Sequence, residues 1–138
     1  MVTQLNTSLL LSYNLAYGGA TVDSALVPPI FWTVHSMRDQ VSEFSENLAA
    51  KPSYAPWTTE NTLVGVWMGV NDVGNSYPRQ DAFSIYRKVM ATYFELLQVL
   101  YDAGVRKFAL LLVPRKPSAS SREYGILISR LQPRTGRR

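Results

Sequence analysis

The sequence predicts an α/β fold in which helices cover a parallel sheet. Three apolar runs, at residues 8–17, 62–68 and 108–113, are typical of buried strands. Between them lie two segments whose apolar residues recur every three or four positions, as in amphipathic helices. Strands that alternate with helices are expected to lie parallel, because the helix provides the crossover between them.

The first half of the chain contains a predicted strand, a break and a predicted helix. The strand at residues 8–17 ends in Gly18-Gly19, and Pro28-Pro29 prevents regular structure after it. Apolar residues at spacings of four, three and four then form one face of a helix. These residues are Met37, Val41, Phe44 and Leu48.

The second half contains a longer helix between two predicted strands. Residues 62–68 form a run too short for an independent helix, so a strand is expected there. Helical spacing begins at Phe83, and Gly104 is placed to end the helix in a left-handed conformation. The stripe continues through Tyr86, Met90, Tyr93, Leu97 and Leu100. A third strand at residues 108–113 is stopped by Pro114.

Charge divides the chain into two predicted parts. The net charge is +4, yet residues 105–138 carry 9 basic and 1 acidic side chains, so the basic character lies at the end. Residues 1–114 are predicted to form one domain, and residues 115–138 a basic, disordered tail. An alternative function follows from this tail, which could bind nucleic acid or an acidic polymer. That alternative is the weaker one, because the basic residues lack aromatic or helical organisation.

Several classes of site and location are not supported by the sequence. Cysteine is absent, which removes thiolate metal sites, and no phosphate-binding glycine loop occurs. Asp39, Glu43 and Glu46 are predicted to form a solvated helix face, so neither a metal nor a cofactor is expected. No run of about 18 apolar residues suggests a membrane span, and the segment after Met1 lacks the features of a signal peptide.

The residues best suited to binding or catalysis lie at two predicted strand ends. Ligands of parallel sheets gather beyond the carboxyl ends of the strands, where Gly18-Gly19 and Asn71-Asp72 lie. An Asn amide and a backbone N–H beside glycine can both donate to a bound oxygen. Two such donors form an oxyanion hole, which stabilises the charge that develops in ester hydrolysis. Alternatively, Asn71-Asp72 only ends the strand through side-chain hydrogen bonds of a turn.

Two motifs together resemble a known family. The stretch NLAYGGATVD at residues 14–23, followed after about fifty residues by GVNDVG, resembles two of the four blocks of the SGNH or GDSL ester hydrolases. It looks closest to the fungal secreted acetylesterases of carbohydrate esterase family sixteen. The run FALLLVP at residues 108–114 is similar to the family's next strand, but Leu112-Val113-Pro114-Arg115 replaces the usual Asn-Val-Pro-Pro. The resemblance covers residues 9–114.

The resemblance implies a fold and a set of site residues. The fold would be a three-layer α/β/α arrangement with a flavodoxin-like parallel sheet, here incomplete. Gly19 would supply a backbone donor to the oxyanion hole and Asn71 a side-chain donor. Asp72 would support the turn, while Asn14 and Tyr17 would shape the pocket, together with Thr21.

The family's nucleophile and its Asp-His pair are missing from this sequence. The serine belongs to a Gly-Asp-Ser block and the pair to D-x-x-H, and neither pattern occurs. Ser24 is expected to be a turn residue, and His35 to be an exposed or capping residue. The interpretation is an internal fragment of an esterase, inactive by itself, whose complete relatives act on small esters or acetylated saccharides. Those relatives are secreted; the location of this chain is not predicted.

Overall fold

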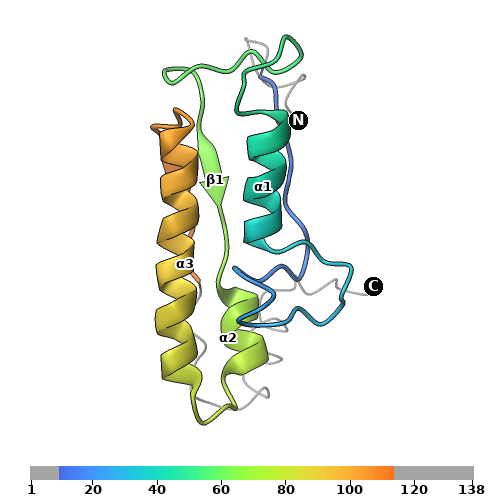
Figure 1. Ribbon diagram of the computed structural model, residues 1–138, viewed down its shortest axis with the longest axis vertical. Coiled ribbons are helices and arrows are strands. Elements are labelled where there is room, and N and C mark those ends of the chain that lie inside the picture. The colour runs from blue at the N-terminus through green and yellow to red at the C-terminus, as the bar shows by residue number, and fades with distance from the viewer. Residues whose placement is uncertain (1–9, 114–138) are drawn as a thin grey trace, which may run out of the picture.

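The computed structural model describes residues 10–113, which contain three helices and two strands. In chain order these are α1 (Met37–Asn47), β1 (Val64–Val66), α2 (Val70–Ser76), α3 (Ala82–Asp102) and β2 (Phe108–Leu110), and Figure 1 labels all of them except β2. The predicted α/β class is confirmed, because helices connect a small parallel sheet. The predicted tail at residues 115–138 lies outside the described residues.

The two strands form one parallel pair whose register is continuous. Val64, Gly65 and Val66 lie opposite Phe108, Ala109 and Leu110. Hydrogen bonds extend the pairing at both ends, from the Val64 N–H to the Lys107 carbonyl at 3.0 Å and from the Leu111 N–H to the Val66 carbonyl at 2.9 Å. Helices α2 and α3 together make the crossover that parallel strands require.

The prediction of a strand at residues 8–17 is wrong for the part that the structure describes. Residues 10–17 form no strand, and Leu10 and Leu11 are each more than half exposed. A strand needs a neighbour for its N–H and C=O groups, and residues 10–17 pair with no strand among the described residues. An apolar run therefore did not suffice, because in residues 10–113 β1 and β2 pair only with each other.

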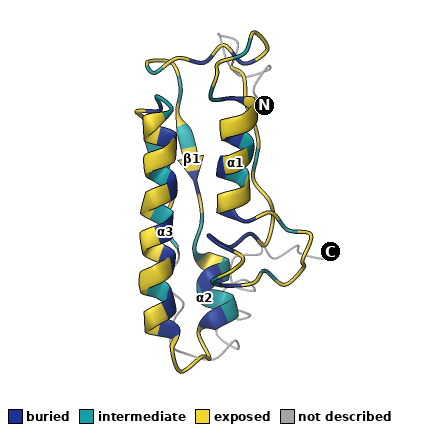
Figure 2. Ribbon diagram, viewed as in Figure 1, coloured by how far each residue is buried: buried dark blue, intermediate teal, exposed yellow. Residues whose placement is uncertain are grey.

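The predicted burial of both faces of the strands is also wrong. Side chains alternate along a strand, and Val66 contributes to the core while Val64 packs against it. On the opposite face Leu63, Gly65 and Trp67 are all exposed. The sheet is thus covered on the face where α1 and α3 pack together, and open on the other (Figure 2).

Helix α1 is where the sequence predicts it, and its start has a clear local cause. Ser36 and Asp39 form a capping box, in which the Ser36 hydroxyl accepts from the Asp39 N–H and the Asp39 carboxylate accepts from the Ser36 N–H. All four residues of the predicted apolar stripe are buried, which confirms that face of the helix. They are Met37, Val41, Phe44 and Leu48.

Helix α3 is confirmed, but the stripe that the sequence selects lies at the edge of the buried face, with Tyr93 and Leu97 only partly buried against the core. The buried residues are Ala82, Ile85, Val89, Thr92, Leu96 and Leu100. Of the predicted stripe, only Leu100 is among them, whereas Phe83 is 84% exposed and Met90 48%. The helix carries two adjacent apolar stripes, and periodicity cannot tell which of them meets the core.

Helix α2 is absent from the prediction. Its sequence, VNDVGNS, lacks strong helix formers, so the residues after β1 suggested a turn. Gly69 precedes the helix with φ 105°, a conformation that favours glycine and redirects the chain from strand to helix. The alternative in which Asn71 and Asp72 form only a turn is therefore corrected: both lie in the first turn of a helix. Proline suits the first turn of a helix, yet Pro78 precedes α3 by four residues.

One core joins α1, α3, β1 and the loop before β1. Trp57 from this loop is 8% exposed, packs against Phe44 at 5.7 Å between ring centroids, and donates its indole N–H to the Leu48 carbonyl at 2.7 Å. Gly104, with φ 110°, turns the chain out of α3 toward β2, as the sequence predicts. No helix in residues 10–113 is both long and apolar enough to cross a membrane.

Replacing Gly104 by Ala tests the turn that ends α3. Because φ is 110° at this residue, Gly104→Ala should lower the free energy of unfolding by about 1–3 kcal/mol, measured by urea denaturation. Gly65→Ala is the matched control, since Gly65 has an ordinary φ and no atom within 4 Å of an added Cβ. Equal effects of the two substitutions would contradict the role given to the Gly104 conformation.

Candidate functional site

Two segments fifty residues apart in the sequence meet at the start of α2. The Asn71 amide donates to the Ala20 carbonyl at 2.9 Å. The carboxylate of Asp72 accepts the Val22 N–H, at 3.0 Å to Oδ1 and 3.2 Å to Oδ2. The structure therefore brings together the two motifs that the sequence singled out.

The same segment also supports the start of α1. The Met37 N–H donates to the Thr21 carbonyl at 2.8 Å, and the Arg38 N–H donates to the Val22 carbonyl at 3.2 Å. These N–H groups belong to the first turn of a helix, where they have no partner within the helix. An ion pair of 2.8 Å between Arg38 Nε and Asp23 Oδ2 strengthens the connection. Residues 20–23 are thus held between the first turns of two helices.

The two predicted oxyanion donors are Asn71 and Gly19, and the hydrogen bond from Asn71 to Ala20 brings them close together. Asn71 is half-buried, and one hydrogen of its amide is engaged by Ala20, the residue after Gly19. A side-chain amide has two hydrogens. The second hydrogen and the Gly19 N–H find no acceptor within residues 10–113. Gly19 is exposed and has φ 84°, so its backbone is open to an approaching group.

Asp72 is buried and acts on the backbone of the other motif. Its exposure is 1%, and burial raises the pKa of its carboxyl above the ordinary 3.8. The hydrogen bond from the Val22 N–H lowers that pKa in part, while the charge of Asp23 raises it. Ser76 donates its hydroxyl to the Asp72 carbonyl at 2.6 Å. These contacts fit a supporting role for Asp72.

Within residues 10–113, neither Asn14 nor Tyr17, the predicted pocket residues, forms a hydrogen bond with the Asn71 amide. Asn14 is exposed, and its side-chain oxygen accepts the nearby Ala16 N–H at 3.1 Å. Tyr17 stacks on His35 with 4.4 Å between ring centroids and 18° between planes. Thr21 is fully buried, and among the described residues its hydroxyl oxygen has no hydrogen-bond partner.

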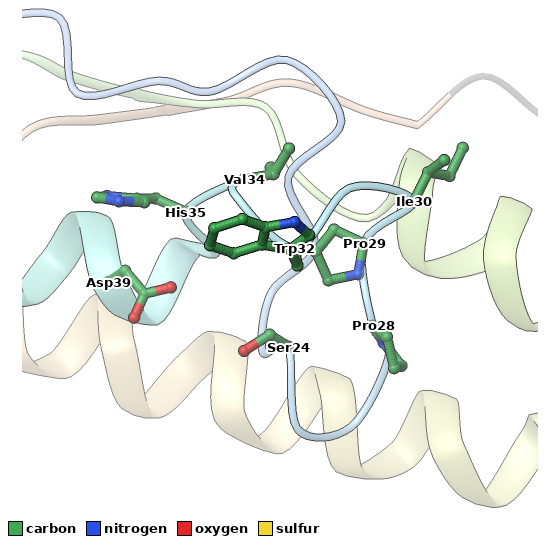
Figure 3. A pocket seen from close by; sticks show the side chains of 8 residues that line it. All are labelled: Ser24, Pro28, Pro29, Ile30, Trp32, Val34, His35 and Asp39. Carbon is green, nitrogen blue, oxygen red and sulfur yellow. The ribbon is translucent and has the colours of Figure 1, made fainter.

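Ser24 and His35 line one hollow of about 570 Å³, which the sequence did not reveal. The other lining residues are Pro28, Pro29, Ile30, Trp32, Val34 and Asp39 (Figure 3). In this view the Ser24 hydroxyl and the His35 ring do not point toward one another. Asp39 accepts from Ser36 rather than from His35. A serine, a histidine and an aspartate therefore share the hollow without the hydrogen bonds of a catalytic triad. Within residues 10–113, no cluster of side chains suited to a metal ion occurs.

Comparison with known proteins gives one relative. A curated protein from Thermothelomyces thermophilus, named "Acetylesterase", is 54% identical to this chain over 114 residues. This chain is a relative of an acetylesterase. The aligned part is 83% of this chain but only 38% of the relative, so the chain spans well under half of that protein's length. No family model and no solved structure matches the chain. This identity confirms the prediction that the chain is related to acetylesterases.

Replacing Asp72 by Asn tests the buried carboxylate through the pH dependence of stability. The folded-state pKa is raised, so the folded protein binds the Asp72 proton more tightly than the unfolded chain does. The advantage of the wild type relative to Asp72→Asn should be largest below the ordinary pKa of 3.8 and should fall as the pH rises through the folded-state pKa. Urea denaturation of both proteins between acidic and neutral pH measures this difference. A difference that grows with pH would show that the pKa is lowered instead.

Replacing Thr21 by Val tests the hydroxyl that lacks a partner. An unpaired buried hydroxyl costs about 1–3 kcal/mol, so Thr21→Val should leave the free energy of unfolding unchanged or raise it. Ser76→Ala is the control, because Ser76 donates a hydrogen bond and its loss should destabilise the protein by about 1 kcal/mol. Equal destabilisation by both substitutions, in urea denaturation, would show that the Thr21 hydroxyl has a partner after all.

Proposed function

We propose that this chain provides the oxyanion-binding part of an ester hydrolase of the SGNH or GDSL type, acting on acetylated saccharides. Gly19 supplies its backbone N–H, and Asn71 supplies the second hydrogen of its amide. The observation that carries the proposal is the hydrogen bond of 2.9 Å between the Asn71 amide and the Ala20 carbonyl, which connects the two motifs. The 54% identity to an acetylesterase supports the same chemistry.

The hydrogen bond to Ala20 suits Asn71 to this role. An amide fixed by one of its hydrogens has a defined direction for the other, so no rotation is needed when charge develops. The neighbouring Asp72 holds Val22 from the same turn of α2, which fixes the backbone close to Gly19. Donors that are oriented before the substrate binds stabilise a transition state more than donors that must reorganise.

Acyl transfer also requires a nucleophile and a base. In enzymes of this type a serine and an Asp-His pair provide them, and Ser24 and His35 are not arranged for that purpose. By itself, therefore, the segment formed by these 138 residues is proposed to bind an ester without forming an acyl-enzyme. Two exposed apolar surfaces fit a larger sheet in a three-layer α/β/α fold. They are the open sheet face at Leu63 and Trp67 and the run at residues 10–17.

A chimera with the relative tests the proposal in a complete enzyme. The 114 aligned residues of the Thermothelomyces protein are replaced by those of this chain, and acetate release is measured with an aryl acetate and with acetylated xylo-oligosaccharides. The chimera should be active. Asn71→Ala in the chimera should lower kcat by about two orders of magnitude with little change in KM, because the donor acts mainly in the transition state.

Two variants control for effects on folding. Asn47→Ala also removes an Asn amide that donates to a carbonyl, that of Glu43 at 2.9 Å, and should leave kcat unchanged. Asn71→Asp keeps the size of the side chain but has no N–H, and should match Asn71→Ala. Thermal unfolding of each variant separates lost stability from lost catalysis. A kcat that survives Asn71→Ala would remove Asn71 from the oxyanion hole.

A further inference from the structure

The loop before α1 presents large apolar side chains to solvent. Trp32 is 92% exposed, and its neighbours Ile30 and Phe31 are 78% and 69% exposed. Three consecutive exposed apolar side chains are unusual on a surface that meets only water. Among them, Trp32 lies over the hollow of about 570 Å³.

The Trp32 loop is fixed to the fold at several points. The Asn75 amide of α2 donates to the Pro28 carbonyl at 3.1 Å, and the Val34 N–H donates to the Phe31 carbonyl at 3.1 Å. The capping box of α1 begins directly after His35. The indole is therefore carried by a loop whose two ends are anchored to different helices, which lowers the cost of ordering it around a ligand.

Two polar side chains line the hollow together with the indole. They are Ser24 and Asp39, which lie below Trp32 in the view of Figure 3. Asp39 uses Oδ2 to accept the Ser36 N–H and hydroxyl, at 2.8 and 2.6 Å, and Oδ1 accepts no hydrogen bond from residues 10–113. The Ser36 hydrogen bond lowers the pKa of Asp39, so the carboxylate is charged at neutral pH.

The hollow adjoins Gly19, one of the two proposed oxyanion donors. Val34 lines it, and the Val34 Cγ2 lies 3.9 Å from the position of a Cβ on Gly19. His35, another lining residue, stacks on Tyr17, two residues before Gly19. A ligand in the hollow would thus lie next to the Gly19 backbone, whose N–H we propose donates to the ester oxygen.

We propose that the hollow under Trp32 binds a sugar ring of the saccharide that carries the ester. This inference rests on the proposed function, and it adds the residues that recognise the saccharide. A pyranose has an apolar C–H face that covers a flat indole, and hydroxyls at its rim that donate to Asp39 Oδ1 and exchange hydrogen bonds with Ser24. A nucleotide offers a flat base too, but its phosphates would be repelled by the charged Asp39. An uncharged saccharide is the better match.

Affinity electrophoresis of the full chain in native gels that contain soluble xylan tests the proposal without any need for turnover. Wild-type protein should be retarded by both acetylated and deacetylated xylan. Trp32→Ala should weaken retardation by roughly tenfold, since the indole contributes most of the apolar contact. Trp32→Phe should retain part of it, and Asp39→Asn should weaken it by a smaller factor. Phe83→Ala is the matched control, because Phe83 is an aromatic residue that is 84% exposed on α3, and it should change nothing.

The outcomes distinguish this inference from the proposed function. Equal retardation of wild type and Trp32→Ala, or no retardation of the wild type, overturns the saccharide site whatever the chimera does. A different outcome is possible, in which retardation depends on Trp32 but the chimera with Asn71→Ala is fully active. That result leaves the saccharide site in place and overturns only the oxyanion hole. Retardation lost equally in Trp32→Ala and Phe83→Ala would indicate general apolar adsorption and overturn the inference.

Discussion

The buried hydrogen bond between the Asp72 carboxylate and the Val22 N–H is the contact on which the rest of the site depends. A carboxylate that is 1% exposed must be compensated, and both of its oxygens meet the same backbone N–H. The bond fixes residues 20–23 against α2, and the carbonyls of Thr21 and Val22 then accept the first N–H groups of α1. These few backbone hydrogen bonds therefore fix α1 and α2, and with them the two sequence motifs, relative to residues 20–23.

The candidate site takes its form from that arrangement. Asn71 precedes Asp72 in the same turn of α2, so its amide reaches Ala20 and is oriented beside Gly19. The Trp32 loop leaves the same segment and returns to it through α1, which places the hollow next to Gly19. The proposed oxyanion donor Gly19 and the proposed saccharide site are thus neighbours because the same backbone segment positions both. The different roles that we propose for them rest on their chemistry: hydrogen-bond donors near Gly19 and an apolar surface at Trp32.

The sequence predicted local elements well and long-range ones unevenly. Helices α1 and α3 were found because their periodicity is a property of the segment itself, and the Ser36 cap confirms the start of the first. The strand at residues 8–17 failed because a strand depends on a partner that its own residues do not reveal. The short helix α2 was missed because VNDVGNS has weak helix propensity, and its contacts with α3 and with residues 20–22 support it instead. Trp32 gave no signal, since a single aromatic residue in a loop belongs to no periodic pattern.

By itself the sequence determined the α/β class, the two longer helices, the left-handed turn at Gly104 and the identity of the two motifs that resemble ester hydrolases. These features depend on residues close together in the chain, or on patterns that residue types alone can show. Only the tertiary structure decided that Asn71 meets Ala20, that Asp72 holds Val22, and that α3 turns Ile85 and Val89 rather than Phe83 and Met90 toward the core. The physical reason is common to all three: each outcome depends on which distant surface is available to receive the group, and periodicity carries no information about that partner.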